Sequence, residues 1–417
     1  MKKFSILVIA VCFLLALIWA GTFYWKNLRG VGPVLNDPPV DIADIIPDVS
    51  TTTPSASPGE NTTGMPLKLP PGFSISIFAK NLSGARVMAF DSFGNMWVSR
   101  TSEGKITMLE VRDGKVVRQN DVFSGLRKPH GLAMEPGLAA GQNVLYYAEE
   151  NKVSRVTLYS DAKPAKITDL PAGGGHFTRT LGFGPDGRLY VSIGSSCNVC
   201  RESDARRAAI YSLNKDGSDF KLFAKGLRNS VFFAWHPETK KMWATEMGRD
   251  LIGDDIPPDE VNIIEEDPST ALGVKNYGWP TCYGKNVHDT DFDHNTYIRN
   301  PCMEPFETQS FVDVPAHSAP LGLVFVPDMG WPTEYRNSLL VAYHGSWNRS
   351  IPTGYKVVRM KFDSEGSYQG TEDFITGWLV SKNEALGRPV DILALPDGTA
   401  YISDDKAGVI YKITAPR

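Results

Sequence analysis

The chain has 417 residues with 43 basic and 47 acidic side chains, and its formal net charge of −4 gives no electrostatic support to a nucleic-acid partner. A content of 42% hydrophobic and 22% charged residues is typical of a globular protein. The 38 glycines and 29 prolines are too few for collagen or for a wholly disordered chain. Turn signals recur at short intervals, which argues against an all-helical fold.

Residues 1–30 are expected to form a membrane anchor. A short basic start precedes an uncharged, mostly apolar stretch from Phe4 to Trp25. As a helix this stretch would span about 33 Å, slightly more than the hydrocarbon layer of a bilayer. The alternative is a cleaved signal peptide, but the stretch is long for one, and Ile18-Trp19-Ala20 is a poor cleavage site. We expect the rest of the chain to lie outside the cytoplasm, on the periplasmic or extracellular face.

Residues 31–66 differ in composition from the segments on either side. Seven prolines fall between Pro33 and Pro66, among threonine, serine, aspartate and asparagine. Such a segment buries little apolar surface and stiffens toward polyproline II. It is interpreted as a disordered linker that holds a folded domain off the membrane.

Four cysteines follow the linker, and their even number beyond a translocation signal indicates two disulfides. The pairing expected from proximity in the sequence is Cys197 with Cys200 and Cys282 with Cys302. A metal site or a redox-active pair is the alternative. Nothing in the sequence shows that the two pairs meet, so disulfides are preferred.

A repeated unit of two short strands joined by a turn occurs six times after residue 67. The turns carry Pro-Asp-Gly or related sequences, in which proline presets one backbone angle and glycine accepts a positive φ. The strands are rich in Val, Ile, Tyr and Trp. The copies are Met88–Asp91 with Met96–Ser99, Leu132–Pro136 with Val144–Ala148, Leu181–Gly187 with Leu189–Ser192, Phe233–Pro237 with Met242–Thr245, Leu323–Asp328 with Leu339–Ala342, and Ile392–Gly398 with Ala400–Ser403.

The repeat predicts an all-β, six-bladed β-propeller over residues 67–417. Blades of about four strands recur every ~40–50 residues in propellers, and the wider spacing here requires an insertion, for which Arg249–His317 is the clearest candidate. A blade exposes both faces of its sheet until ring closure buries them. An array of β-sandwiches or a β-helix is the alternative.

Three histidines lie just before the first strand of a copy, where the loops of a propeller gather at one mouth. His176 follows Gly173-Gly174-Gly175, whose small size leaves space for a ligand, and His130 and His317 have comparable positions. They could converge near the axis, where a histidine is the simplest general base at neutral pH. The alternative is polar loop residues that satisfy backbone groups. His236 lies in a turn and is interpreted as a packing residue.

Two cations have the same topological place. Arg228, followed by Asn229, precedes the fourth copy, and Arg388 precedes the sixth. Fixed guanidinium groups at these positions suit a small polyanionic ligand, whereas surface salt bridges are the alternative. The stretch His288–Asn295 has alternating acids but lacks the glycine and the glutamate of an EF-hand loop, so it is interpreted as a solvated acidic loop.

Four short motifs occur together in one order: Gly-Leu-Arg-Asn at 226–229, Glu-Met-Gly at 246–248, Asp-Glu-Val-Asn at 259–262, and Asn-Tyr-Gly-Trp-Pro at 276–280. In order and spacing they resemble the soluble quinoprotein sugar dehydrogenases, and the chain is nearest to the sorbosone and pyranose dehydrogenase branch. That family is a six-bladed propeller that binds pyrroloquinoline quinone (PQQ) and calcium at its mouth and oxidises sugars.

The resemblance implies a role for each matched residue. His176 matches the base that takes the hydroxyl proton while hydride passes to the quinone. Arg228 matches the cation beside the quinone oxygen, where negative charge develops, and Asn229 matches an amide that binds PQQ. An acidic residue expected before the base is Gly175 here, so no adjacent carboxylate orients the imidazole.

The resemblance also implies residues for the metal and for the carboxylates of PQQ. Gly248 matches a backbone-carbonyl ligand of calcium, and Arg249 falls at the position of its neighbour, where its own carbonyl can serve. Arg388 matches a partner of a PQQ carboxylate. A lysine expected in the stretch 341–349 is missing, and Arg349 is expected to replace it.

The function implied is PQQ-dependent oxidation of a sugar or related aldehyde, with calcium polarising the quinone. A small sugar is the expected substrate, and a membrane quinone or a cytochrome is the expected electron acceptor beside the anchor. Two alternatives remain open: a membrane-tethered binding propeller without enzymatic activity, and a calcium-dependent lactonase on the same fold.

Overall fold

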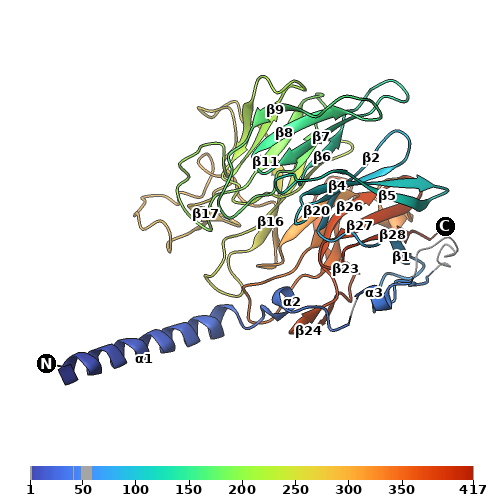
Figure 1. Cartoon of the computed structure of the whole chain (residues 1–417). Coiled ribbons are helices and arrows are strands. Elements are labelled where there is room, and N and C mark those ends of the chain that lie inside the picture. The colour runs from blue at the N-terminus through green and yellow to red at the C-terminus, as the bar shows by residue number, and fades with distance from the viewer. Residues whose placement is uncertain (1, 41, 48–58, 417) are drawn as a thin grey trace.

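The computed structural model describes residues 2–40, 42–47 and 59–416. Its bulk is a ring of antiparallel sheets, and one long helix, α1 (Lys2–Asn27), extends away from the ring (Figure 1). In the described part of the chain, one helix is long and apolar enough to cross a membrane, and its candidate span is Ser5–Asn27. This helix agrees with the anchor expected from the sequence, although a signal sequence would have the same length and composition.

Six sheets of four strands each form the blades of a propeller, which confirms the predicted fold. The first blade consists of β2 (Ala85–Phe90), β3 (Met96–Arg100), β4 (Lys105–Arg112) and β5 (Lys115–Phe123). The second consists of β6 (Leu132–Met134), β7 (Val144–Glu149), β8 (Lys152–Thr157) and β9 (Ala165–Asp169). The third consists of β10 (Leu181–Phe183), β11 (Leu189–Ile193), β12 (Ala209–Leu213) and β13 (Lys221–Lys225).

The other three blades include the closure of the ring. The fourth blade consists of β14 (Phe233–Trp235), β15 (Met242–Glu246), β16 (Asp259–Ile264) and β19 (Val312–Val314). The fifth consists of β20 (Pro320–Phe325), β21 (Ser338–Tyr343), β22 (Lys356–Phe362) and β23 (Tyr368–Ile375). The sixth consists of β26 (Pro389–Ala394), β27 (Thr399–Asp404), β28 (Val409–Thr414) and β1 (Ser74–Ala79). In the last blade β1 pairs with β28, with Ile75 opposite Ile413. The first strand of the domain therefore closes the ring by hydrogen bonding to the last.

Each predicted copy of the repeat is the first and second strand of one blade. The turn at Pro185-Asp186-Gly187 shows why the sequence folds this way: Gly187 has φ of +79°, and the Asp186 carboxylate accepts a hydrogen bond from Arg188 N at 3.1 Å. The second strands β3, β11 and β15 are buried along their whole length. Burial of each large apolar side chain stabilises the ring by about 1.5–3 kcal/mol.

The predicted insertion was too wide. Arg249–His317 contains β16, which pairs with β15 across Met242↔Ile264 to Glu246↔Glu260 and is the third strand of the fourth blade. The inserted segment proper runs from residue 265 to 311 and carries a small hairpin, β17 (Cys282–Tyr283) with β18 (Val287–His288). A second hairpin, β24 (Leu379–Ser381) with β25 (Glu384–Ala385), precedes the last blade.

The linker predicted over residues 31–66 is described in part, and residues 41 and 48–58 lie outside the described residues. Two short helices occur in it, α2 (Gly32–Leu35) and α3 (Ile42–Ile45). Its last residues lie against the propeller: Thr62 N donates to Ile75 O at 2.9 Å, and Met65 is buried.

The strand directions define two faces of the ring. In each blade the first strand begins at one face, which we call the mouth, and the turn to the second strand lies at the opposite face. The loops before the first strands and after the second strands therefore gather at the mouth. The predicted blade-entrance residues all lie on these loops.

Candidate active site at the mouth of the propeller

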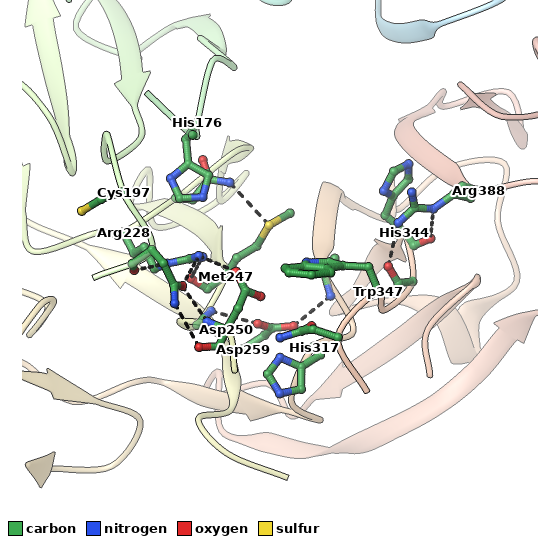
Figure 2. A pocket seen from close by; sticks show the side chains of 17 residues that line it. His176, Cys197, Arg228, Met247, Asp250, Asp259, His317, His344, Trp347 and Arg388 are labelled. Atoms are coloured by element: carbon green, nitrogen blue, oxygen red, sulfur yellow. Dashed lines mark hydrogen bonds and ion pairs between the residues drawn. The ribbon is translucent and has the colours of Figure 1, made fainter. Parts of the chain in front are cut away.

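A cavity of about 430 Å³ opens at the mouth (Figure 2). A volume of this size is typical of a pocket for a small organic ligand. Six residues predicted from the sequence line it together: His176, Arg228, Asn229, Gly248, His317 and Arg388. They come from loops of four blades, so ring closure is required to assemble the site.

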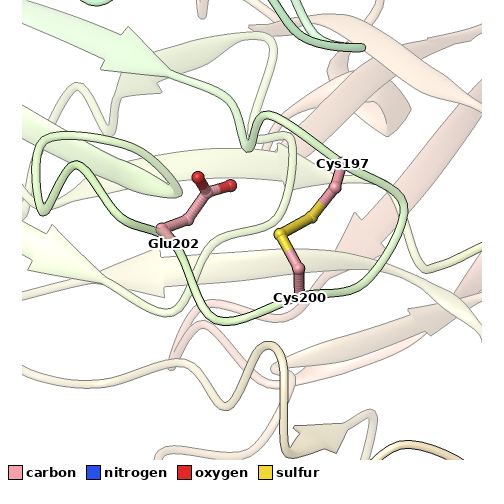
Figure 3. A group of neighbouring side chains, drawn as sticks. All are labelled: Cys197, Cys200 and Glu202. Carbon is pink, nitrogen blue, oxygen red and sulfur yellow. A yellow bond between two sulfur atoms is a disulfide. The ribbon is translucent and has the colours of Figure 1, made fainter.

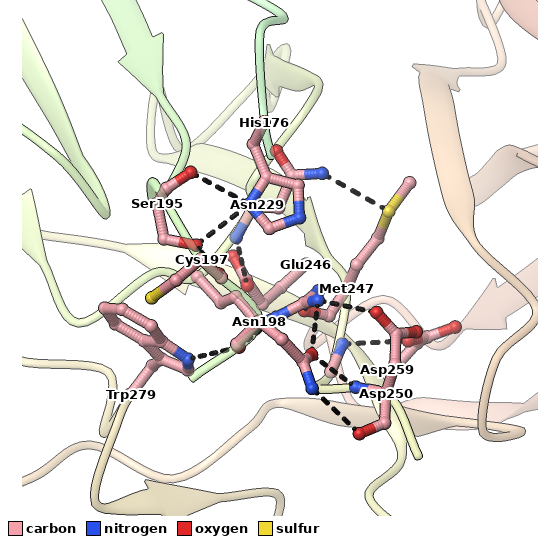
Figure 4. Close-up of polar contacts among 12 residues, drawn as sticks. His176, Ser195, Cys197, Asn198, Asn229, Glu246, Met247, Asp250, Asp259 and Trp279 are labelled. Carbon is pink, nitrogen blue, oxygen red and sulfur yellow. Dashed lines mark hydrogen bonds and ion pairs between the residues drawn. The ribbon is translucent and has the colours of Figure 1, made fainter. Parts of the chain in front are cut away.

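His176 reaches the cavity from the loop between β9 and β10. Its Nδ1 lies 3.0 Å from the carbonyl oxygen of Ser195 and 2.8 Å from the Ser195 hydroxyl (Figure 4). A carbonyl only accepts hydrogen bonds, so Nδ1 carries the proton and Nε2 keeps its lone pair. Burial, and then the nearby Arg228 guanidinium, lower the pKa of His176 to about 3. The ring is therefore neutral at physiological pH and can accept a proton at Nε2.

The glycines before His176 allow the loop to approach its neighbour closely. Gly174 has φ of +85°, and a Cβ at this position would lie 2.6 Å from the Cα of Ser196. Ser195, the orienting partner of the imidazole, directly precedes Ser196. The carboxylate that the sequence lacks before the base is thus replaced by a backbone carbonyl from the next loop.

Arg228 is held rigidly at the floor of the cavity and is 3% exposed. Its Nε donates to the carbonyl oxygen of Asn198 at 2.8 Å, and its Nη2 donates to the Asn198 side-chain oxygen and to Asp250 Oδ2, each at 2.8 Å. Nη1 donates to Met247 O at 3.3 Å. Five donors are available on a guanidinium, and these contacts fix its plane beside the cavity (Figure 2).

A disulfide-closed loop positions Asn198. The predicted disulfides Cys197–Cys200 and Cys282–Cys302 are both formed, with S–S distances of 1.99 Å and 2.05 Å. Cys197 lines the cavity, and Glu202 beside the first disulfide accepts hydrogen bonds from Ser196 (Figure 3). Because both sulfurs are bonded to each other, this cysteine pair is not available as a metal ligand set.

Arg388 faces Arg228 across the cavity. Its Nε donates to His344 O at 3.1 Å and its Nη2 to Gly345 O at 2.7 Å, and its guanidinium lies over the Tyr355 ring at 5.7 Å. Burial lowers the pKa of this arginine. The two guanidinium groups bind mainly carbonyl oxygens at their backs, and Arg388 has no carboxylate within ion-pair distance in the described part of the chain. Arg228 is paired with Asp250, so the positive charge left unpaired for an anionic ligand is that of Arg388.

Asn229 and the acidic side chains behind it complete the predicted set. The Asn229 backbone N–H donates to Glu246 Oε1 at 2.8 Å, and among the described residues its side-chain Nδ2 donates only to the Met247 sulfur, at 3.4 Å. Gly248 N donates to Asp259 Oδ1 at 2.9 Å. Burial raises the pKa of Asp259 to about 7, so this carboxylate would gain from a cation at the cavity.

Several cavity residues were not identified from the sequence, among them Asn198, Asp250, Asp259, His344, Trp347 and Asn348. Asn348 is the most informative, since it is 2% exposed and neither its amide oxygen nor its amide nitrogen has a partner among the described residues. A buried amide without partners costs free energy unless a ligand satisfies it. His344 Nε2 donates to Asp405 Oδ1 at 2.8 Å. These residues lie after second strands, not before first strands, which is why the search of blade entrances missed them.

Of the three blade-entrance histidines, two reach the cavity. His317 lines it, with Nε2 2.7 Å from Gly253 O. His130 is fully buried outside the lining, and its Nε2 has no partner among the described residues, so two of the three histidines line this cavity. His236 packs against Trp243 and Phe325, which confirms its interpretation as a packing residue.

The structure does not bring two predicted arginine side chains into the cavity. Arg349 donates to the carbonyl oxygens of Asp254 and Ala316 and pairs with Asp255 at 2.8 Å, so the expected contact of its guanidinium with a cofactor is not supported. Arg249 pairs with Asp289 at 2.7 Å in a neighbouring small cavity. Its predicted contribution was its backbone carbonyl, which stays a prediction.

The acidic stretch 288–295 is solvated only in part: residues 290, 291, 294 and 295 are exposed, whereas two of its acids are buried. Asp289 and Asp293 are each 3% exposed. Asp289 pairs with Arg249, and Asp293 accepts hydrogen bonds from Tyr297 at 2.7 Å and from His288 at 3.1 Å. Asp293 is thus paired within the insertion, whereas Asp289 ties the insertion to Arg249 in the loop after β15.

The fold and site define a six-bladed β-propeller whose mouth holds a cavity lined by two arginines, two aspartates and several amide and imidazole side chains. The TrAA12-like family matches residues 67–416, and the chain belongs to this family. An uncharacterized protein of Borreliella burgdorferi is 31% identical over 365 residues, which cover 83% of this chain and 90% of that protein. The relative with a described activity is a pyrroloquinoline quinone-dependent pyranose dehydrogenase of Coprinopsis cinerea, 24% identical over 82% of this chain.

The chain spans about half the length, 54%, of the Coprinopsis relative. Solved structures agree on the fold. The PQQ domain of that pyranose dehydrogenase, in its holo form, has a TM-score of 0.68 at 21% identity and covers 86% of this chain and 99% of that one. A calcium structure of the AA12 enzyme of Trichoderma reesei has a TM-score of 0.70 at 20% identity and covers 87% of this chain and 99% of that one.

Proposed function

We propose that this protein is a PQQ-dependent sugar dehydrogenase tethered to a membrane with its propeller outside the cytoplasm. The observation that carries the proposal is the convergence of one neutral imidazole and two guanidinium groups on a single cavity at the mouth. The family and the PQQ-dependent relatives support the class of reaction. A membrane quinone or a cytochrome would suit the anchor as the electron acceptor.

The lining of the cavity fits PQQ, a flat molecule with three carboxylates and a quinone. Arg228 and Arg388 supply the positive charge that these groups need, and Asn229 supplies an amide. The unpartnered amide of Asn348 supplies both a donor and an acceptor that the protein itself leaves unsatisfied. In this arrangement Arg388 would bind a carboxylate, and Arg228 would lie beside the quinone oxygens.

The donor set near Gly248 fits calcium. Calcium prefers hard oxygen ligands from carboxylates and carbonyl groups. Asp259 and Asp250 both line the cavity, and the Gly248 carbonyl is expected beside them. When bound, PQQ supplies a two-electron acceptor, and calcium polarises one of its oxygens.

The protein residues contribute base catalysis and electrostatic stabilisation. His176 Nε2 would take the proton of the sugar hydroxyl as the carbon is oxidised, and Ser195 holds the ring in the required tautomer. Arg228, fixed by Asn198 and Asp250, would stabilise the negative charge that develops at the acceptor end of the cavity. A positioned general base contributes about 10²–10⁴-fold to the rate.

Reconstitution tests this proposal. The purified protein is incubated with PQQ and calcium, and dye reduction is followed over a panel of aldoses and their aldehyde analogues. We expect PQQ-dependent reduction with at least one sugar, and we expect a His176→Ala variant to bind PQQ but to lose activity. An absence of dye reduction with every sugar, together with an absence of PQQ binding, would reject the proposal.

A further inference from the structure

The N-terminal helix ends next to the mouth of the propeller. α1 ends at Asn27, and three residues later the Gly30 backbone N–H donates to Arg349 O at 2.8 Å. Gly30 is buried there, and a Cβ at this position would collide with the Arg349 carbonyl. Three extended residues span at most about 10 Å. The propeller therefore meets the chain within about 10 Å of the end of the helix.

Contacts continue through the next six residues. α2 packs beside β25, Asn36 Nδ2 donates to Asn383 O at 2.9 Å, and Lys406 Nζ donates to Asn36 O at 2.7 Å. The loop that holds Arg349 joins β21 to β22, and the loop that holds Lys406 joins β27 to β28, so both lie at the mouth. Figure 1 shows α1 leaving the molecule on the side where α2 and β24 lie. A spacer after residue 30 thus cannot hold the mouth away from the anchor.

Exposed apolar side chains surround this attachment. Trp347 and Ile351 flank Arg349 on its loop, and Ile351 is 72% exposed. Leu35 on α2 and Val380 on β24 are exposed beside them, and Ile256 is exposed on a loop that Asp254 ties to Ser350. We call these five residues the rim: Leu35, Ile256, Trp347, Ile351 and Val380. Isolated apolar residues on a surface are ordinary, but these are gathered around the end of an apolar helix.

The end of the helix has the composition of a membrane interface. Tyr24 and Trp25 are exposed, Lys26 follows, and the Arg29 guanidinium lies 4.4 Å from the Trp25 ring centre. Aromatic and basic residues are enriched at the level of the lipid headgroups. That layer is about 5–7 Å deep on each side of the hydrocarbon. A loop held three residues from this point is within reach of the headgroups.

We propose that the rim lies on the lipid bilayer, so that the membrane borders the cavity on the side of Trp347 while the side of His176 stays open to water. The partner is the lipid surface itself, because the anchor of the same chain brings the rim to it. Trp347 belongs to the rim and also lines the cavity. The bilayer would therefore begin where the cavity wall ends.

A pair of matched label sites tests the placement without using enzyme activity. Cys12 is the free cysteine of the described residues, and the other four cysteines form disulfides. In a Cys12→Ser background, Ile351→Cys places a fluorophore on the rim. Met329→Cys is the control: it is 69% exposed in the same blade, but it follows β20 at the opposite face, about 17–20 Å away along β21.

Both variants are labelled with an environment-sensitive dye and reconstituted as full-length chains in phosphatidylcholine vesicles that contain headgroup-level nitroxide lipid. We expect the label at 351 to emit at shorter wavelength than in detergent-free buffer and to lose at least half of its intensity to the nitroxide, while the label at 329 changes little. Equal emission and equal quenching at the two sites would overturn the proposal. So would N-terminal sequencing of a mature chain that lacks the helix.

The result is independent of the proposed dehydrogenase activity. Lipid contact at residue 351 without PQQ binding would support the lipid-facing rim and reject the proposed function. Oxidation of sugars with PQQ without lipid contact at residue 351 would support the proposed function and reject the lipid-facing rim.

Discussion

Replacement of Asn198 by alanine is the sharpest test of how the site is assembled. The Asn198 side chain accepts from Arg228 Nη2 and from Asp250 N, at 2.8 Å and 2.7 Å, and donates to Asp250 O at 3.0 Å. Arg228 would keep its bonds to the Asn198 carbonyl and to Asp250 Oδ2. The variant therefore loosens the guanidinium without removing its charge.

The magnitude follows from the bonds lost. A hydrogen bond to a charged group stabilises by about 1.5–3 kcal/mol, and each neutral bond by about 0.5–1.5 kcal/mol. We expect the free energy of unfolding to fall by about 2.5–6 kcal/mol, the sum over one charged and two neutral bonds. A reacting group misplaced by about 1 Å can lower the rate about 100-fold. Because three anchors remain on Arg228, at Asn198 O, Asp250 Oδ2 and Met247 O, we expect kcat/KM to fall by about 10–100-fold, which is about 1.4–2.7 kcal/mol.

The assays are thermal unfolding and dye-linked steady-state kinetics with saturating PQQ and calcium. Asn214→Ala is the matched control, because Asn214 accepts from the Arg188 guanidinium at 2.8 Å and donates to Ser218 at 2.9 Å, in a turn that does not line the cavity. We expect this control to lose stability and to keep kcat/KM within about twofold of the wild type. If Asn198→Ala also kept kcat/KM within that range, Arg228 would not be the group that this loop positions.

Three further predictions concern the base, the loop that holds it and the metal. His176→Gln should lower kcat at least about 100-fold with little change in PQQ affinity. Because burial and Arg228 lower the pKa of His176 to about 3, the wild-type rate should not fall as pH is lowered through 6.5. A fall near pH 6.5 that is absent in His176→Gln would contradict the assignment. Gly174→Ala should have a lower melting temperature than Gly173→Ala. Both glycines have positive φ, but only at position 174 would an added Cβ meet Ser196. Equal melting temperatures of the two variants would contradict the close approach of this loop to Ser196. Burial raises the pKa of Asp259 to about 7, whereas the pKa of an aspartate in the unfolded chain is about 3.9. Between these two pH values the native protein binds more protons than the unfolded chain. The free energy of unfolding without calcium should therefore fall by up to about 4 kcal/mol as pH rises from about 4 to about 7. Calcium should then raise the melting temperature more at pH 8 than at pH 5, and Asp259→Asn should remove the difference; calcium stabilisation independent of pH in the wild type would contradict a role for this carboxylate.

The fold was predictable because its repeat is local. Each copy is two strands and one turn, and a turn such as Pro185-Asp186-Gly187 carries its own signal. The pairing of β1 with β28 joins residues more than three hundred positions apart, and no local sequence pattern predicts it. β16 was hidden in the predicted insertion because its strand stands between two long loops and lacks a Pro-Asp-Gly turn.

The site was predictable where residues precede first strands and less so elsewhere. His176, Arg228, Asn229 and Arg388 lie on such loops and line one cavity. Asn348 lies on a loop after a second strand, and its importance depends on its having no protein partner, which only coordinates show.

The prediction that Arg349 contacts a cofactor was not supported, for a different reason. Its place in the sequence is close to the cavity, but Asp254 and Asp255 from another blade turn its guanidinium away. Side-chain direction at a propeller mouth depends on neighbours that the sequence does not place in space. The same reason explains why His130 is buried while His317 reaches the cavity.

An absorbance titration of the metal-free protein with PQQ, with and without calcium, tests the central claim most directly. If Arg228, Arg388 and the amides hold one shared ligand, the wild type should show saturable binding at a single equivalent that calcium tightens. The Arg388→Gln variant should bind more weakly by about tenfold or more, as expected when a charge-assisted contact is lost. Equal affinities in the two proteins, or no saturable spectral change in the wild type, would contradict the account.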